Sequence, residues 1–94
     1  MAQFVHIGYG NMVNADRVDA IVSPDGAPIK RLVQSAKEEG YAVDATQGRK
    51  TKAVIITSDR ILILSSLQPE TIARRFAEAY KYEDKGESEE HDNE

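Results

Sequence analysis

The hydrophobic pattern of this chain predicts six short strands and two helices. Short stretches rich in Val, Ile, Leu and Phe are separated by Gly, Asn, Asp and Ser, which is typical of strands joined by turns. Arg17 to Val22 shows the alternation expected of a strand with one buried face. The predicted strands cover residues 3–7, 12–13, 17–22, 41–45, 53–56 and 61–64.

The two helices follow the third and the sixth predicted strands. The first is expected over Ala27 to Glu39, because Pro28 suits a first turn and Gly40 stands where a left-handed cap belongs. The second opens at Gln68-Pro69-Glu70. Apolar residues at helical spacing mark the expected buried faces: Ile29, Leu32, Val33 and Ala36 in the first, and Ile72, Ala73, Phe76, Ala77 and Tyr80 in the second.

The resulting order, β-β-β-α-β-β-β-α, predicts an α+β fold with a small mixed or antiparallel β-sheet and two helices. Ala53 to Ile56 and Ile61 to Leu64 are uninterrupted apolar runs, which indicates strands buried on both faces. Two helices of this length cover roughly one face of a small sheet. We therefore expect a second subunit to cover the other face, so that the protein forms a homo-oligomer.

Composition places these elements in one domain. The chain has 94 residues and no cysteine, so disulfides and thiolate metal sites are excluded. No stretch approaches the roughly 20 apolar residues of a membrane span. The N-terminus lacks a basic region followed by an apolar run, so we expect no secretory signal and a cytoplasmic protein.

The net charge of −4 is distributed unevenly. Residues 1–82 carry 11 Lys and Arg against 9 Asp and Glu, a net of +2, whereas residues 83–94 carry one Lys against 7 Asp and Glu, a net of −6. We expect a folded domain over 1–82 and a disordered acidic tail over 83–94. The tail is interpreted as a solubilising segment or, alternatively, as an intramolecular mimic of nucleic acid.

The segment Gln47 to Lys52 is the strongest functional candidate. It places Arg49, Lys50 and Lys52 beside Gly48, between two predicted strands, and a short Gly-containing connection predicts a β-hairpin. Closely spaced cations at such a tip suit a polyanion, because they neutralise phosphates and release counterions. The alternative is a solvated turn. Arg17, Lys30 and Arg31 are further candidates for the same face, although spacing alone cannot bring them together.

Other chemistry finds little support in the sequence. Gly8-Tyr9-Gly10 begins like a dinucleotide fingerprint, but Val13 replaces the third glycine and no helix opens there. His6 has no carboxylate at ligand spacing, and no nucleophile has an ordered base beside it. We expect no enzyme, no metal and no cofactor.

Five segments together resemble one known family. They are Ile7 to Asn11, Ile21 to Pro24, Ala27 to Arg31, Asp44 to Thr51 and Gln68 to Thr71. In this order and spacing they are similar to the bacterial extracellular matrix regulatory protein A (RemA-like) family, over about residues 3 to 77. Each segment alone is weakly specific, and the specificity comes from all five in register.

The resemblance implies a DNA-binding transcription regulator that activates biofilm-matrix and osmoprotection genes. It also implies a LytTR-like fold, ring assembly and duplex DNA as partner, with no small-molecule substrate. The family's DNA-contacting arginines correspond to Arg17 and to the Arg49-Lys50 pair, and Pro28 matches a proline that the family needs at its helix start. A ring would repeat the basic tip, which predicts modest sequence specificity and steep salt dependence.

Two features depart from the family pattern. Lys50 stands where the family usually has arginine, which keeps the charge but loses the bidentate fork. The acidic tail is not part of the common pattern and is expected to lower DNA affinity at low salt. Two other classes stay open: a protein-interaction ring or scaffold without nucleic acid, and an RNA binder that stacks bases on Tyr9 and Tyr41.

Overall fold

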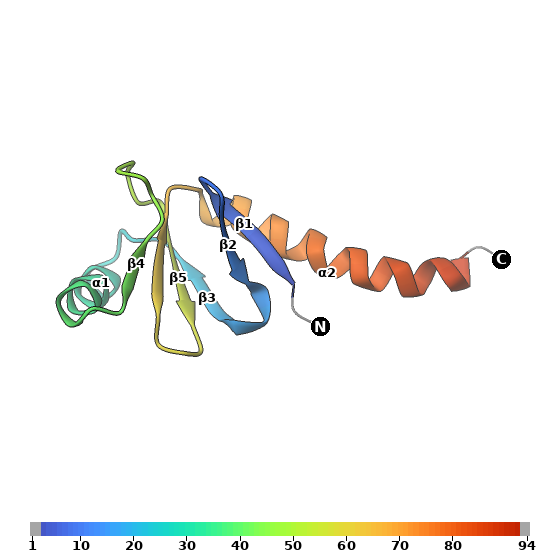
Figure 1. Cartoon of the computed structure of the whole chain (residues 1–94), viewed down its shortest axis with the longest axis horizontal. Helices are drawn as coiled ribbons and strands as arrows, with labels where there is room; N and C mark the ends of the chain where they lie inside the picture. The colour runs from blue at the N-terminus through green and yellow to red at the C-terminus, as the bar shows by residue number, and fades with distance from the viewer. Residues whose placement is uncertain (1–2, 93–94) are drawn as a thin grey trace.

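The computed structural model describes the backbone of residues 3–92 and the side chains of residues 3–80. The predicted order of strands and helices is confirmed (Figure 1). The prediction of a disordered tail over 83–94 stays a prediction, and the described backbone belongs to α2 up to Asp92. The elements are β1 (Phe4–Gly8), β2 (Asn11–Asn14), a 3-10 turn η1 (Ala15–Arg17), β3 (Val18–Val22), α1 (Ala27–Glu39), β4 (Ala42–Asp44), β5 (Ala53–Thr57), β6 (Leu62–Ser65) and α2 (Pro69–Asp92).

The strands form two sheets where one was expected. β1 and β2 make an antiparallel pair of their own. The other four strands lie in the order β3-β5-β6-β4, in which β4 runs parallel to β6 and the remaining pairs are antiparallel. The fold is therefore α+β, with both parallel and antiparallel strand pairs. Its class agrees with the prediction, but the strands are divided between two sheets.

The predicted hairpin around the basic segment is wrong. β4 pairs with β6, Ala42 opposite Leu62 and Asp44 opposite Leu64, and not with β5. The place beside β5 is taken by β6, because only three residues separate Thr57 from its partner Ile61 and so short a loop closes at little entropic cost. Residues 45–52 therefore cross the end of β6 to connect β4 with β5.

β5 and β6 are buried on both faces, as predicted, but elements of the same chain cover both faces. On one face, Val54 and Leu64 pack with Ala36 of α1. On the other face, Ile55 packs with residues of the β1–β2 pair and with Ile72 of α2. A second subunit is therefore not needed to cover this face, because the β1–β2 sheet and α2 of the same chain cover it. Homo-oligomer formation itself stays a prediction.

The helices differ from their predicted faces at a few positions. On α2 the inward stripe consists of buried Ile72 and half-buried Phe76 and Ala79. The predicted face members Ala73, Ala77 and Tyr80 on α2, and Leu32 on α1, are exposed. Alanine is small and helix-forming, so it fits either face and marks neither. No helix within the described part of the chain is long and apolar enough to cross a membrane.

Candidate nucleic-acid interface

Residues 45–52, called the basic loop from here on, form a defined turn. Gln47 and Gly48 both have positive φ, 54° and 78°, and the Arg49 N–H donates to the Thr46 carbonyl at 3.0 Å. Positive φ at both central residues defines a tight type I′ turn. The local turn chemistry that the sequence indicated is therefore present, although the flanking strands do not pair.

Asp44 holds the start of the basic loop. Its Oδ1 accepts hydrogen bonds from the hydroxyl and, at 2.9 Å, from the backbone N–H of Thr46. These two bonds, the hydroxyl first, lower the pKa of Asp44 below the ordinary 3.8. Burial opposes them, and the charge of Lys37 adds a lesser lowering. Asp44, the last residue of β4, thus caps the turn that follows it.

Ser65 connects the basic loop to the β1–β2 turn. Its backbone carbonyl accepts from Lys52 N at 2.8 Å. Its hydroxyl donates to the Ile7 carbonyl at 2.9 Å and accepts from Leu67 N at 3.1 Å. The side chain is fully buried, with 0% of its surface exposed. This one residue therefore fixes two surface loops relative to each other, and a lone serine after an apolar strand gives no sequence signal of that role.

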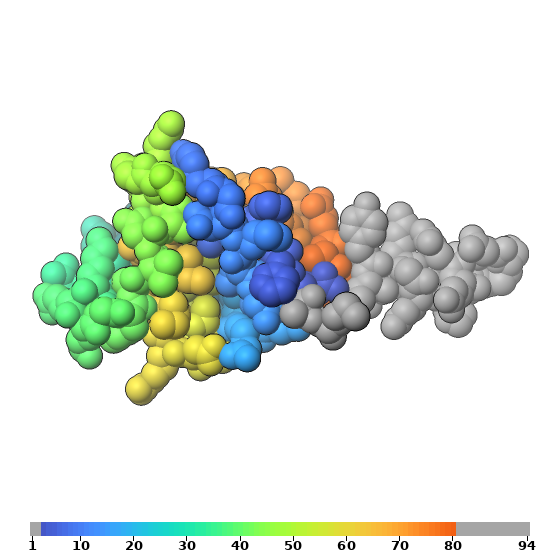
Figure 2. Space-filling model, viewed as in Figure 1, coloured from blue at the N-terminus to red at the C-terminus, as the bar shows by residue number. Residues whose placement is uncertain are grey.

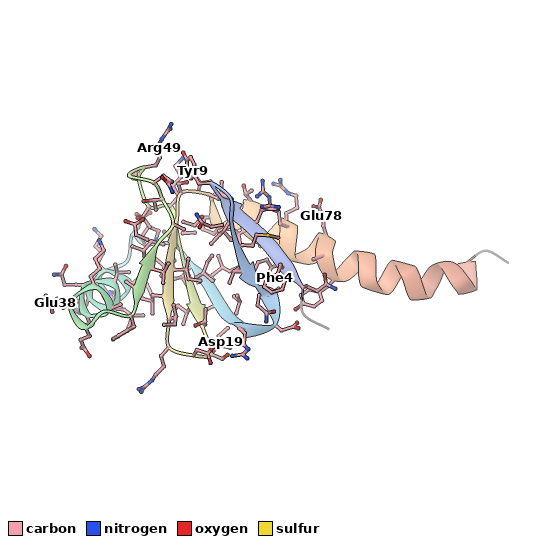
Figure 3. The ribbon with its side chains drawn as sticks, viewed as in Figure 1. Phe4, Tyr9, Asp19, Glu38, Arg49 and Glu78 are labelled. Carbon is pink, nitrogen blue, oxygen red and sulfur yellow. The ribbon has the colours of Figure 1, made fainter. Side chains whose placement is uncertain are left out.

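The three cations of the basic loop are exposed. Figure 2 shows the lime-coloured loop projecting beside the blue β1–β2 turn, and Figure 3 shows Arg49 pointing outward there. Lys50 and Lys52 also line a hollow of about 240 Å³. Its other walls are the segment before α1, with Asp25, and the start of α2, with Glu70, so the hollow itself carries both signs of charge.

Both helices begin beside this hollow, and helix N-termini carry partial positive charge. Lys30 and Arg31 are exposed near the start of α1, whose first turn contains no acidic residue. A cation at a helix N-terminus is unfavourable by about a few tenths of a kcal/mol, because the helix dipole favours a carboxylate there. Lys30 and Arg31 therefore add positive charge to a helix end that is already positive. Pro28 lies in the first turn, as predicted.

Arg17 lies away from the basic loop within one protomer. It ends η1 where a strand start was expected, and its Nη1 contacts Asp59 Oδ2 at 2.7 Å with 58% of each side chain exposed. Val18 pairs with Thr57 at the far end of β5, whereas the basic loop precedes Ala53 at the near end. The length of β5, about 13 Å, separates the two positions. The structure thus gathers Arg49, Lys50 and Lys52 but not Arg17.

The Gly8-Tyr9-Gly10 segment is a hairpin turn. Gly8 pairs with Asn11, which leaves Tyr9 and Gly10 as a two-residue loop with φ of 55° and 78°. The segment therefore opens no helix, in agreement with the sequence analysis. Among the described residues, no group of three or more His, Cys, Asp or Glu is arranged to hold a metal ion.

Comparisons with known proteins give the family of this chain. The model of the extracellular matrix regulatory protein A-like family matches residues 4–76. A provisionally named regulatory protein of Geobacillus thermodenitrificans is 56% identical over 86 residues, which cover 92% of this chain and 99% of the relative. Similar relatives occur in Clostridium botulinum, 52% identical over 94% of this chain and 97% of the relative, and in Gloeothece citriformis, 57% identical over 79% and 84%.

The family match spans both sheets, α1, the basic loop and the first turns of α2. All three relatives carry names that assign a regulatory role, and the alignments cover most of their length. The chain therefore belongs to the RemA-like family of extracellular matrix regulatory protein A-like proteins.

Proposed function

We propose that this protein is an oligomeric, DNA-binding transcription regulator that grips the phosphate backbone of duplex DNA through its basic loop. The observation that carries the proposal is the exposed Arg49-Lys50-Lys52 cluster, held in a fixed turn by Asp44 and Ser65. Membership in a family of regulatory proteins supports it. The proposal assigns the chain no catalytic role and keeps biofilm-matrix genes as the expected targets.

Phosphate contacts explain how such a loop would act. Each neutralised phosphate contributes a slope of about −0.9 to the dependence of log affinity on log salt. Three cations therefore give one protomer a slope near −3 at most and weak binding alone. Repetition of the loop in a ring would raise avidity by a factor of about 10² to 10⁴ without a new type of contact. Sequence preference would then come mainly from DNA bendability.

Arg17 has a separate place in this proposal. Arg17 lies at the other end of β5, where Asp59 neutralises its charge. A duplex bound to the basic loop of one protomer would therefore contact Arg17 only by extending along the length of the sheet, or it would contact Arg17 of another protomer. Surface ion pairs of this kind contribute about 0–1 kcal/mol, so a phosphate can replace Asp59 at little cost. We expect Arg17→Ala to weaken DNA binding less than Arg49→Ala.

The test is duplex binding by fluorescence anisotropy over a salt series, combined with native mass measurement. Arg49→Ala and Lys50→Ala should each weaken binding and reduce the salt slope by about one, while the oligomer mass stays unchanged. Arg74→Ala, an exposed cation on α2, is the matched control and should bind as the wild type does. Loss of the oligomer in Arg49→Ala would make the loop structural, and salt-insensitive self-association without duplex binding would favour the scaffold.

A further inference from the structure

Tyr9 occupies a backbone conformation that its side chain disfavours. At φ 55° it is the first central residue of a type I′ turn, where Asn, Asp and Gly are preferred because Cβ crowds the backbone at positive φ. Three non-glycine residues of the described chain have positive φ, Tyr9, Gln47 and Arg60. Two of these, Tyr9 and Gln47, lie on the neighbouring turns along the side of the molecule that carries Arg49. Strain gathered in this way is characteristic of functional sites.

Within the described part of the chain, the tyrosine ring makes no contact with the hydrophobic core that would offset this strain. Tyr9 has 51% of its surface exposed, and neither hydrophobic cluster of the described residues includes it. The turn is held by other groups, since the Asn11 side-chain amide donates to the Gly8 carbonyl at 3.0 Å. An asparagine or glycine would make the same turn with less strain. The ring is therefore unnecessary for the hairpin in which it stands.

The position of Tyr9 is nevertheless fixed relative to the basic loop. The Ile7 carbonyl, two residues before Tyr9, accepts from the Ser65 hydroxyl, and the Ser65 carbonyl accepts from Lys52 N. A Cβ added to Gly8 would lie 3.7 Å from Leu67 Cγ, so the turn also packs closely on the segment that leads into α2. Figure 3 shows Tyr9 and Arg49 near each other along one side of the molecule, beyond the ends of the strands.

We propose that Tyr9 is a second, uncharged contact to the same DNA backbone. Its hydroxyl would donate a hydrogen bond to a phosphate oxygen while its ring packs against the adjoining deoxyribose, and the basic loop supplies the ionic attraction. A tyrosine loses little side-chain entropy on binding, and the rigid turn presents it already oriented. The inference rests on the proposed function, since it names a further residue of the same interface.

Tyr9→Asn is the informative variant because it separates strain from binding. It removes the ring and suits positive φ, so we expect a melting temperature several degrees higher together with duplex affinity lowered about tenfold. The salt slope should be unchanged, because no charge is lost. Tyr9→Phe keeps the ring and loses the hydroxyl, and should lose about threefold in affinity. Met12→Gln, on the same hairpin with 48% exposure, is the matched control and should bind normally.

Duplex affinity of Tyr9→Asn equal to that of the wild type would overturn the inference and leave the proposed function intact. A lower melting temperature for Tyr9→Asn with unchanged affinity would overturn it as well, because the ring would then be structural. Wild-type protein that binds no duplex at any salt concentration would overturn the proposed function itself. The salt series on the wild type is therefore measured first, so that the two failures are distinguished.

Discussion

Replacing Ser65 with alanine tests whether one buried hydroxyl holds the candidate interface together. The substitution removes the bonds to the Ile7 carbonyl and to Leu67 N, at 2.9 and 3.1 Å, and leaves the backbone bond to Lys52 in place. Ile7 falls at the register shift of the β1–β2 pair, between the paired residues His6 and Gly8. Its carbonyl accepts the hydrogen bond from the Ser65 hydroxyl.

The expected destabilisation follows from these two bonds. A net hydrogen bond contributes about 1 kcal/mol, and a buried partner left unpaired costs about 1–3 kcal/mol. Because alanine leaves the Ile7 carbonyl without its donor in a fully buried environment, we expect Ser65→Ala to lower the free energy of unfolding by about 2 kcal/mol. For a domain of this size each kcal/mol shifts the melting temperature by about 4–8 °C.

Urea unfolding followed by far-UV circular dichroism gives the free energy, and duplex anisotropy gives the affinity. Both should fall in Ser65→Ala, because the Tyr9 turn loses its hydrogen bond to the residue whose carbonyl still holds Lys52 of the basic loop. Ser58→Ala, an exposed serine in the β5–β6 turn, is the matched control and should stay within about 0.5 kcal/mol of the wild type. A Ser65→Ala protein as stable as Ser58→Ala would refute the anchoring role.

Three further predictions concern charge. Lys50→Arg restores the fork and should strengthen duplex binding several-fold with the salt slope unchanged, which anisotropy measures; equal affinity would mean that Lys50 acts only as a point charge. The lowered pKa of Asp44 contributes stability that is fully present above the ordinary value of 3.8 and is lost as the pH falls through the lowered one. Thermal melts from pH 7 to pH 2.5 should therefore show a smaller acid loss for Asp44→Asn than for the wild type, and parallel curves would contradict this. Truncation after Tyr82 removes a net charge of −6 and should raise duplex affinity at low salt but not at high salt, and an increase independent of salt would exclude electrostatic competition by the tail.

Local signals in the sequence were sufficient to predict the order of helices and strands, and α1 in particular. Pro28 at its start and Gly40, with φ 86°, at its end gave the helix bounds without error. Strand pairing was less accessible, because hydrophobic runs show that a strand is buried but not which strand lies beside it. β4 has only three residues, and its parallel partner β6 lies beyond β5 in the chain.

The candidate site was also predicted in part. The cluster of Arg49, Lys50 and Lys52 is visible in the sequence because its members are neighbours along the chain. Arg17 could not be assigned to that cluster or separated from it, since its position depends on the direction of β3 in the sheet. The roles of Ser65 and Tyr9 depend on a buried hydrogen bond and a backbone angle, and neither is encoded by residue type alone.

The crossover that carries the basic loop has a consequence for the order of folding. β5 and β6 can pair as soon as their short turn closes, whereas β4 adds to the edge of β6 only after that hairpin exists. The basic loop is therefore ordered late in folding and opens early in local unfolding, while β3, β5 and β6 stay paired. Amide hydrogens of residues 42–52 should exchange with solvent faster than those of β5, and a bound duplex should slow that exchange.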